Sequence, residues 1–233
     1  MADTFLRAEW RKLVMVNYEV PAKVLNPYLP HGTQLDSWQG KCYVSLVGFM
    51  FMNTAVKGCK LPGHVTFEEV NLRFYVTHES GEVKRGVVFI KEIVPKPLIT
   101  FIANKLYKEN YETRPMDHFW KTNESSFEVV YRWYLDNQVQ FMAVETALSP
   151  VNLTPGSKEE FITEHYWGYA KVTEDLTNEY QVKHPPWKVY PVKKASISVD
   201  FGLNYGSEFS FLNELKPASV FLAEGSSISV GDK

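Results

Sequence analysis

Apolar and polar residues alternate along residues 67–76, and this pattern predicts a β-strand with two unlike faces. Neither Gly nor Pro interrupts the stretch, and β-branched and aromatic residues, which favour strands, recur through it. One face is an apolar stripe, formed by Val70, Leu72, Phe74 and Val76. The opposite face is a polar row, formed by Glu69, Asn71, Arg73 and Tyr75. The polar row is either the solvated side of a half-exposed strand or the lining of a partly enclosed cavity, for which a carboxylate, an amide and a guanidinium make a compact polar set.

Short strand patterns recur along most of the chain, between turns rich in Gly, Pro, Asn and Asp. A turn at 79–82 joins the first strand to a partner over 83–94, and a turn at 136–137 joins strands over 126–135 and 138–148. Further strands are predicted over 13–18, 41–52, 165–172, 178–183, 188–201 and 217–224. Helices are predicted over 95–111, after Pro21, and after a capping box formed by Ser157 and Glu160. Several hairpins with few helices are typical of a mostly β (α+β) fold, an antiparallel barrel or sandwich.

Length and composition narrow the class of protein. A chain of 233 residues fits one domain spanning 1–233, because β folds of this length often remain single. The aromatic share of 15% predicts a core or pocket rich in rings. The formal net charge of −2 argues against nucleic acid as a partner, since no basic stripe offsets phosphates. No apolar run reaches the roughly 20 residues needed to cross a bilayer, and the first residues lack a secretory signal pattern, so we expect a soluble, cytoplasmic protein with no membrane partner.

Cofactors and metals are not expected. No Gly-rich phosphate loop stands at a strand-to-helix turn, and the two cysteines are too few for a disulfide framework or a zinc site. His165 and Trp167 share one face of a predicted strand, and His184 lies beside a Pro-Pro-Trp corner. Two histidines so placed could bind a metal together with Glu69, but no His-x-His or His-x-x-x-His spacing supports such a site. We therefore interpret the histidines as cavity lining or packing.

A set of short motifs, spread in order over nearly the whole chain, carries a family resemblance. They are LPHG at 29–32, LD at 35–36, GKCYVSLVGF at 40–49, FEEVNLRFYV at 67–76, RGVVF at 85–89, HYWGY at 165–169, HPPW at 184–187, YG at 205–206, PASV at 217–220 and EGS at 224–226. Together they resemble the YqjF-like family of uncharacterised bacterial proteins, which is grouped with acetoacetate decarboxylase. The resemblance implies a large antiparallel β barrel, cone-shaped, with a central cavity and a few peripheral helices.

The resemblance also implies a chemistry that the local sequence supports only in part. Acetoacetate decarboxylase uses a Schiff-base lysine whose pKa is lowered by a second lysine, in a Gly-Phe-Pro-Lys-Lys segment surrounded by buried glutamates and an arginine. The matching segment here reads GVVFIKEI over 86–93, without the proline or the second lysine, and Glu92 stands where a cation is wanted. Alternation places Lys91 on the face of Phe89, as a partly desolvated lysine or as a strand-end lysine that reaches water. The adjacent pair Lys193 and Lys194 lies in another predicted strand.

We predict a ligand cavity lined by Glu69, Asn71 and Arg73. Arg73 would bind a carboxylate, Asn71 would orient it, and Glu69 would hold the arginine or move a proton. Further ligand-binding candidates are Tyr75, His165 and Trp167.

Two function hypotheses follow, and both have a small organic acid, keto or carboxylic, as ligand. The preferred one is a binding protein that lacks the decarboxylase lysine pair. The alternative is a lyase that acts on a β-keto acid, with Lys91 and Glu69 as catalytic residues. A third interpretation is that the chain's own aromatic side chains fill the cavity. A homodimer through an edge strand is compatible with the sequence, although no residue specifies one.

Overall fold

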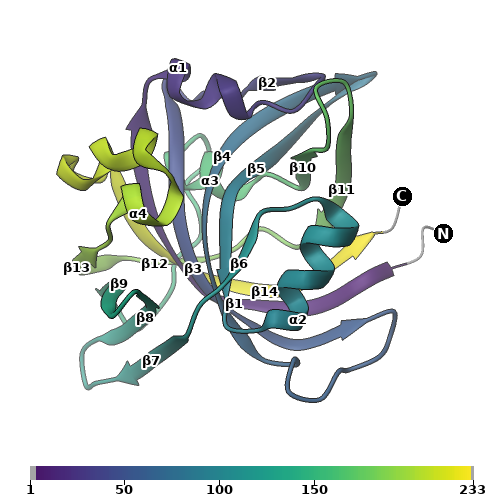
Figure 1. Ribbon diagram of the computed structural model, residues 1–233. Coiled ribbons are helices and arrows are strands. Elements are labelled where there is room, and N and C mark those ends of the chain that lie inside the picture. The colour runs from purple at the N-terminus through teal and green to yellow at the C-terminus, as the bar shows by residue number, and fades with distance from the viewer. Residues whose placement is uncertain (1–3, 232–233) are drawn as a thin grey trace.

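The computed structural model describes residues 4–231, apart from the side chains at positions 80, 106 and 107. Most of this part of the chain forms strands, which build a 10-stranded sheet and a 4-stranded sheet (Figure 1). The larger sheet contains β1 (Thr4–Val20), β2 (Thr33–Leu35), β3 (Cys42–Val56), β4 (Phe67–Ser80), β5 (Glu82–Val94), β6 (Tyr111–Thr113), β10 (Trp167–Lys171), β11 (Thr177–Lys183), β12 (Val189–Tyr190) and β14 (Ser219–Gly231). The smaller sheet contains β7 (Met116–Thr122), β8 (Phe127–Leu135), β9 (Gln138–Thr146) and β13 (Val192–Ser198). The prediction of a mostly β fold with few helices is confirmed.

The pairings of the larger sheet return to their starting strand. The strand order is β2-β4-β3-β1-β14-β11-β10-β5-β6, and β4 also pairs with β5. Neighbouring strands are antiparallel except for β10–β5 and β5–β6, which are parallel. The long strands bend, so the sheet curls into a cone-like shape with an inner and an outer face (Figure 1). Because of this curl, a strand can bury the side chains of one face in the interior of the cone and those of the other face on its outside.

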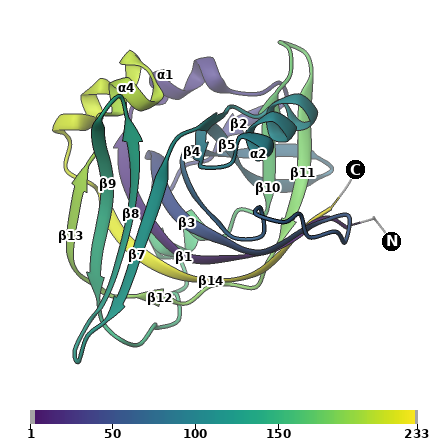
Figure 2. The same cartoon turned by 60° about the horizontal axis from the view of Figure 1, so that its bottom comes forward.

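Short helices lie around the sheets. They are α1 (Ala22–Leu25), the 3-10 turn η1 (Asn26–Tyr28), α2 (Pro97–Ile102), the π-helical turn η2 (Ala103–Tyr107), α3 (Lys158–Thr163), α4 (Phe201–Tyr205) and the 3-10 helix η3 (Ser207–Glu214). In both views α1 and α4 lie together at one end of the molecule, and α2 lies near β10 and β11 (Figures 1 and 2). Half of the predicted capping box is present, because the Ser157 side chain accepts a hydrogen bond from the Glu160 backbone N–H at 3.2 Å, whereas the Glu160 side chain accepts from the Gly156 N–H and not from that of Ser157. No helix within residues 4–231 is both long and apolar enough to span a membrane.

The outer face of the larger sheet packs against the 4-stranded sheet, which lies over its side (Figure 2). The predicted apolar stripe of β4 belongs to this outer core, which also includes Tyr131, Trp133 and Met142 from β8 and β9. Val70, Leu72, Phe74 and Val76 are fully buried there. Gly48 on β3 permits the close approach, because a Cβ atom at that position would lie 2.6 Å from Met142 Sδ and 3.0 Å from the Tyr131 ring. The second core, on the inner face, is separate and includes Phe49, Phe51 and Phe67.

Candidate functional site

The inner face of the larger sheet encloses a cavity of about 190 Å³. One part of its wall is apolar and rich in rings, and includes Leu13, Phe49, Phe51, Phe67, Ile99 and Ile102. The other part is polar, and includes Glu69, Asn71, Arg73, Glu92, Glu109 and His165. The aromatic side chains therefore leave internal space, and the interpretation in which they fill the interior is wrong.

The polar row of β4 faces this cavity. Glu69, Asn71 and Arg73 line it and are only 2%, 1% and 8% exposed. They project inward because Val70 and Leu72, which alternate with them, belong to the outer core. The Asn71 Nδ2 atom donates a hydrogen bond to Glu69 Oε1 at 2.9 Å. These three residues of the row thus line a partly enclosed space and do not form the solvated side of a strand.

A β-bulge in β5 decides which of its residues face the cavity. Phe89 pairs with Arg73 of β4, but the next pair along joins Lys91 to Leu72, so Ile90 is an extra residue in β5. Strict alternation would place residues 89 and 91 on the same side. The bulge reverses the alternation from position 91 onward.

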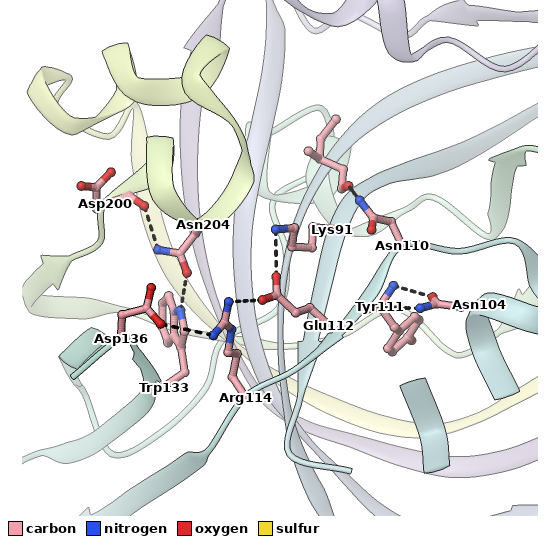
Figure 3. A network of polar contacts seen from close by, with 11 residues as sticks. Lys91, Asn104, Asn110, Tyr111, Glu112, Arg114, Trp133, Asp136, Asp200 and Asn204 are labelled. Carbon is pink, nitrogen blue, oxygen red and sulfur yellow. Dashed lines mark hydrogen bonds and ion pairs between the residues drawn. The ribbon is translucent and has the colours of Figure 1, made fainter. Parts of the chain in front are cut away.

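Lys91 and Glu92 consequently take the opposite sides from those predicted. Lys91, expected on the face of Phe89, lies on the outer face, where its Nζ donates to Glu112 Oε2 at 2.9 Å (Figure 3). Glu112 also forms an ion pair with Arg114. Glu92 lines the cavity and is 2% exposed. The predicted placement of Lys91 is therefore wrong, and its role as a Schiff-base nucleophile stays a prediction without support from its position.

The segment after η2 brings two more functional groups to the cavity. Lys108 adopts a left-handed conformation, with φ of 59°, and ends the helical run, so the predicted helix over 95–111 is shorter than expected. The Asn104 side chain accepts a hydrogen bond from Tyr111 N at 2.7 Å and donates one to Tyr111 O at 2.9 Å (Figure 3). Asn110 Nδ2 donates to the carbonyl oxygen of the bulged residue of β5 at 2.7 Å. These bonds hold Glu109 and Tyr111 against β5.

Three carboxyl groups therefore share one cavity. Tyr111 Oη donates to Glu69 Oε2 at 3.2 Å, and Tyr180 Oη donates to Glu109 Oε1 at 2.9 Å. Glu92 lies opposite Asn71 of β4 on one side and opposite Tyr111 of β6 on the other.

Burial raises the pKa of each of these carboxyl groups. The pKa of Glu69 rises to about 7, although hydrogen bonds from Asn71 and Tyr111 oppose the shift. Burial raises the pKa of Glu109 to about 8, and repulsion by Glu69 adds to it. Burial also raises the pKa of Glu92 well above its ordinary value, and the charges of Glu109 and Glu69 raise it further. At pH 7, Glu109 therefore holds its proton while Glu69 titrates.

His165 reaches the cavity from the segment before β10. Its Nε2 lies 3.0 Å from Asp36 Oδ2, which also accepts a hydrogen bond from Arg85 Nε at 2.8 Å. Burial alone would raise the pKa of Asp36, but the hydrogen bonds from His165 and Arg85 outweigh it and hold this pKa below its ordinary value. Burial lowers the pKa of His165 to about 4, against the effect of Asp36. At pH 7 the imidazole is therefore neutral, with Nε2 donating to Asp36 and Nδ1 left as an acceptor.

Several buried polar atoms around this cavity have no hydrogen-bond partner within residues 4–231. On the polar side they are Asn71 Oδ1, Arg73 Nε, Glu92 Oε2 and His165 Nδ1, and on the ring-rich side Trp10 Nε1 and Thr54 Oγ1. Buried polar groups are normally paired, so each such atom calls for a water or a ligand.

The other predicted ligand-binding residues take different positions. Trp167 lines the cavity, and Lys84 Nζ lies 4.1 Å from its ring centroid. Tyr75 is not part of the cavity lining, because its hydroxyl is hydrogen-bonded to Ser45 Oγ at 2.6 Å and its ring packs on His165 with centroids 4.7 Å apart.

The remaining candidates lie outside the cavity. His184 stacks on Trp187, with ring centroids 4.2 Å apart, and does not approach Glu69 as a second metal ligand would. Lys193 and Lys194 are exposed on β13. Within the described part of the chain no lysine lines the cavity, and no group of three or more His, Cys, Asp or Glu side chains is arranged to hold a metal ion.

Sequence reasoning missed Glu92, Glu109, Tyr111 and Asp36 as site residues. Glu92 was hidden by the bulge, and Glu109 with Tyr111 fell inside a predicted helix. A usable signal existed only for Asp36, because it stands in one of the motifs that carry the family resemblance, as His165 does in another.

Comparisons with known proteins identify the family. The family model DUF2071, described as an uncharacterized conserved protein, matches residues 7–227. The chain belongs to this family. The DUF2071 chain is also 25% identical over 197 residues to the uncharacterized protein YqjF of Bacillus subtilis strain 168, a match that covers 84% of this chain and 78% of YqjF.

Solved structures show that this DUF2071 protein has the fold of acetoacetate decarboxylase. The acetoacetate decarboxylase of Legionella pneumophila superposes with a TM-score of 0.64 at 10% identity, over 97% of this chain and 84% of the other. An acetoacetate decarboxylase-like enzyme of Sphingomonas wittichii RW1 gives 0.65 at 10% identity, over 98% and 91%. The enduracididine biosynthesis enzyme MppR, in complex with the condensation product of pyruvate and imidazole 4-carboxaldehyde, gives 0.64 at 12%, over 99% and 87%. At these identities the similarity concerns the fold alone.

Proposed function

We propose that this protein binds a small organic acid, keto or carboxylic, in the cavity. The observation that carries the proposal is the group of unpartnered buried atoms on the polar wall, at Asn71, Arg73, Glu92 and His165. Each such group left unpaired costs about 1–3 kcal/mol, so an arrangement of several in one enclosed space is better explained by a bound molecule than by folding.

Arg73 is the residue that favours an acid. It is 8% exposed, forms no ion pair within residues 4–231, and its Nε lacks an acceptor. A guanidinium binds a carboxylate through two parallel hydrogen bonds, which fixes orientation as well as charge. Asn71, two residues along the same strand, is placed to orient the same ligand.

The raised pKa values of the neighbouring carboxyl groups are consistent with this ligand. At neutral pH Glu109 holds its proton, and burial raises the pKa of Glu92 well above its ordinary value, so these two groups favour the neutral form, which does not neutralise Arg73 and can donate a hydrogen bond to an anionic ligand. The solved relatives add support of another kind, because MppR binds pyruvate in the same fold. That support is an analogy of fold, whereas Arg73 and the unpartnered atoms belong to this chain.

A Schiff-base lyase is the alternative function. It is favoured by the likeness to acetoacetate decarboxylase, but it requires a lysine within reach of the ligand. Lys91 lies on the outer face with Glu112. The preferred proposal therefore assigns no nucleophile and treats the site as one that binds.

The test is the thermal stability of the protein with a panel of 2-keto and carboxylic acids at pH 6.0. A ligand at about 100 times its Kd should raise the melting temperature by about 5–10 °C, from roughly 2.7 kcal/mol of binding linkage. Arg73→Gln should abolish the rise and Arg73→Lys should retain part of it. Arg132→Gln, which removes a half-exposed arginine of β8 far from the cavity, is the matched control. An equal rise in the wild type and in Arg73→Gln would contradict the proposal.

A further inference from the structure

Asn71 and Glu92 on the polar wall need hydrogen-bond donors, which a carboxylate does not have. Asn71 and Glu92 lie directly opposite each other on β4 and β5, so their Cβ atoms are roughly 4.5–5.5 Å apart. The Asn71 amide nitrogen is already bonded to Glu69, which leaves its oxygen Oδ1 as an acceptor. Tyr111 is hydrogen-bonded to the Glu92 carboxyl group, but Glu92 Oε2 is unpartnered, and in the ionised form this oxygen only accepts hydrogen bonds. When Glu92 is ionised, two unmatched acceptors, Asn71 Oδ1 and Glu92 Oε2, thus lie on facing residues.

His165 adds a third acceptor to the same wall. Its Nε2 is committed to Asp36, and Nδ1 is buried and unpartnered. Among the unpartnered buried atoms of the polar wall within residues 4–231, Arg73 Nε is the one nitrogen that can only donate. An acid that carries acceptors alone would satisfy Arg73 and leave the three acceptors without partners.

The charges around the cavity also favour a ligand with a cationic group that donates hydrogen bonds. Glu69, Glu92 and Glu109 meet a single guanidinium, that of Arg73, and no lysine of the described chain lines the space. In the unligated protein, protons on the carboxyl groups relieve this imbalance. A ligand cation would replace those protons and could donate up to three hydrogen bonds if it were an ammonium group.

We infer that the ligand carries a protonated amine in addition to its carboxylate, and that the site takes an amino acid or a close analogue. Arg73 receives the carboxylate, and Glu92 with Asn71 Oδ1 receives the ammonium. The positions of Asn71 and Arg73 lie roughly 7 Å apart along β4, and both polar side chains are long enough to converge on a group of this size. The ring-rich wall with Phe49, Phe51 and Phe67 then accommodates an apolar side chain. This inference rests on the proposed acid-binding function and refines it.

Matched compounds separate the two ideas. Three sets share a side chain, methyl, isobutyl or benzyl, and each set consists of a 2-keto acid, the amino acid and the amine that lacks the carboxylate. Affinities are measured by titration calorimetry at pH 7.5 with the wild type, Glu92→Gln and the control Arg132→Gln. Within at least one set the amino acid should bind about 10-fold more tightly than the keto acid, a difference of about 1.4 kcal/mol. Glu92→Gln should remove this advantage, so that the amino acid and the keto acid of one set then bind within about 3-fold of each other.

A second readout needs no variant. Because the ammonium group replaces protons on the carboxyl groups, binding of the amino acid should release protons into the buffer. The apparent binding enthalpy should then differ between two buffers of unequal ionisation enthalpy. The keto acid should release none.

The outcomes are distinct. Keto acids that bind as tightly as their amino acids, with no proton release, would overturn the inference and leave the acid-binding function intact. Amines that bind while neither acid does would overturn the acid-binding function and the inference with it. Failure of all three sets would overturn both.

Discussion

Two polar clusters on the inner face of the larger sheet differ in one respect. The first, formed by Asn17, Ser45 and Tyr75, is closed: Ser45 Oγ donates to Asn17 Oδ1 at 2.5 Å and is hydrogen-bonded to Tyr75 Oη at 2.6 Å. Asn17 Nδ2 completes it by donating to Ser219 Oγ at 3.0 Å.

The second cluster surrounds the cavity a short distance along the same strands. It combines Glu69, Asn71, Arg73 and Glu92, and three of these residues carry unpartnered atoms. Both clusters are equally buried. Burial of polar groups therefore does not identify the site, whereas incomplete hydrogen bonding does.

The largest expected effect is on the pH dependence of stability, because buried carboxyl groups line the cavity whereas the closed cluster has none. Glu69 and Glu109 hold their protons up to about pH 7 and about pH 8 when folded, but only up to about 4.5 when unfolded. The folded state thus binds more protons across this window, and the free energy of unfolding should fall by several kcal/mol as pH rises from about 4.5 to about 8. Urea unfolding at a series of pH values measures it. A free energy that rises over this window would show that the carboxyl groups are ionised in the folded protein.

The next effect tests the closed cluster. Asn17→Ala should lower the free energy of unfolding by about 2–4 kcal/mol, because it removes the hydrogen bonds that buried Asn17 makes with Ser45 and with Ser219. Asn71→Ala removes a side chain of equal burial that makes one hydrogen bond, and should cost less than half as much. Denaturant unfolding at pH 6.0 compares the two. Equal losses would mean that the clusters do not differ as described.

A smaller effect, of opposite sign, is expected from Glu92→Gln. The substitution keeps the shape of the side chain and removes a buried ionisable group, so it should raise the free energy of unfolding by about 1–2 kcal/mol at pH 8.5. The melting temperature should rise by about 2–8 °C, and the gain should shrink at pH 5. A loss of stability at both pH values would show that Glu92 is fully paired in the folded protein.

The smallest effect is expected from Lys91→Ala on the outer face. Its ion pair with Glu112 is part-exposed, and such pairs contribute about 0–1 kcal/mol. The variant should therefore stay within about 1 kcal/mol of the wild type and bind acids equally well. Borohydride reduction of the wild type with a β-keto acid, followed by intact mass measurement, should give no adduct at Lys91. An adduct there would establish the Schiff-base chemistry and reject our assignment.

The sequence predicts the site where local alternation holds and fails where the backbone departs from it. On β4 the polar row follows a regular strand, so Glu69, Asn71 and Arg73 were identified correctly as one side of that strand. The bulge at Ile90 has no sequence mark, since neither Gly nor Pro accompanies it. The pairing of His165 with Asp36 joins positions separated by 129 residues and depends on the closure of the whole sheet.

The predicted strand over 188–201 fails for a related reason. The structure divides this stretch between β12 and β13, which belong to different sheets, with Pro191 between them. The alternation of apolar and polar residues predicts which side chains share a face of a strand, but it does not predict with which other strand that strand pairs.

The bulge in β5 also affects how residues of this strand are compared between proteins with this fold. From position 91 onward it decides which residues of β5 face the cavity, so the carboxyl group of Glu92 lines the wall and the amine of Lys91 lies on the outer face. A regular strand with the same letters would present the amine. A column-by-column alignment of β5 with a homologue in which this strand is regular would therefore equate residues that point in opposite directions. Inheritance of chemistry in this fold has to be traced through backbone irregularities as well as through residue identities.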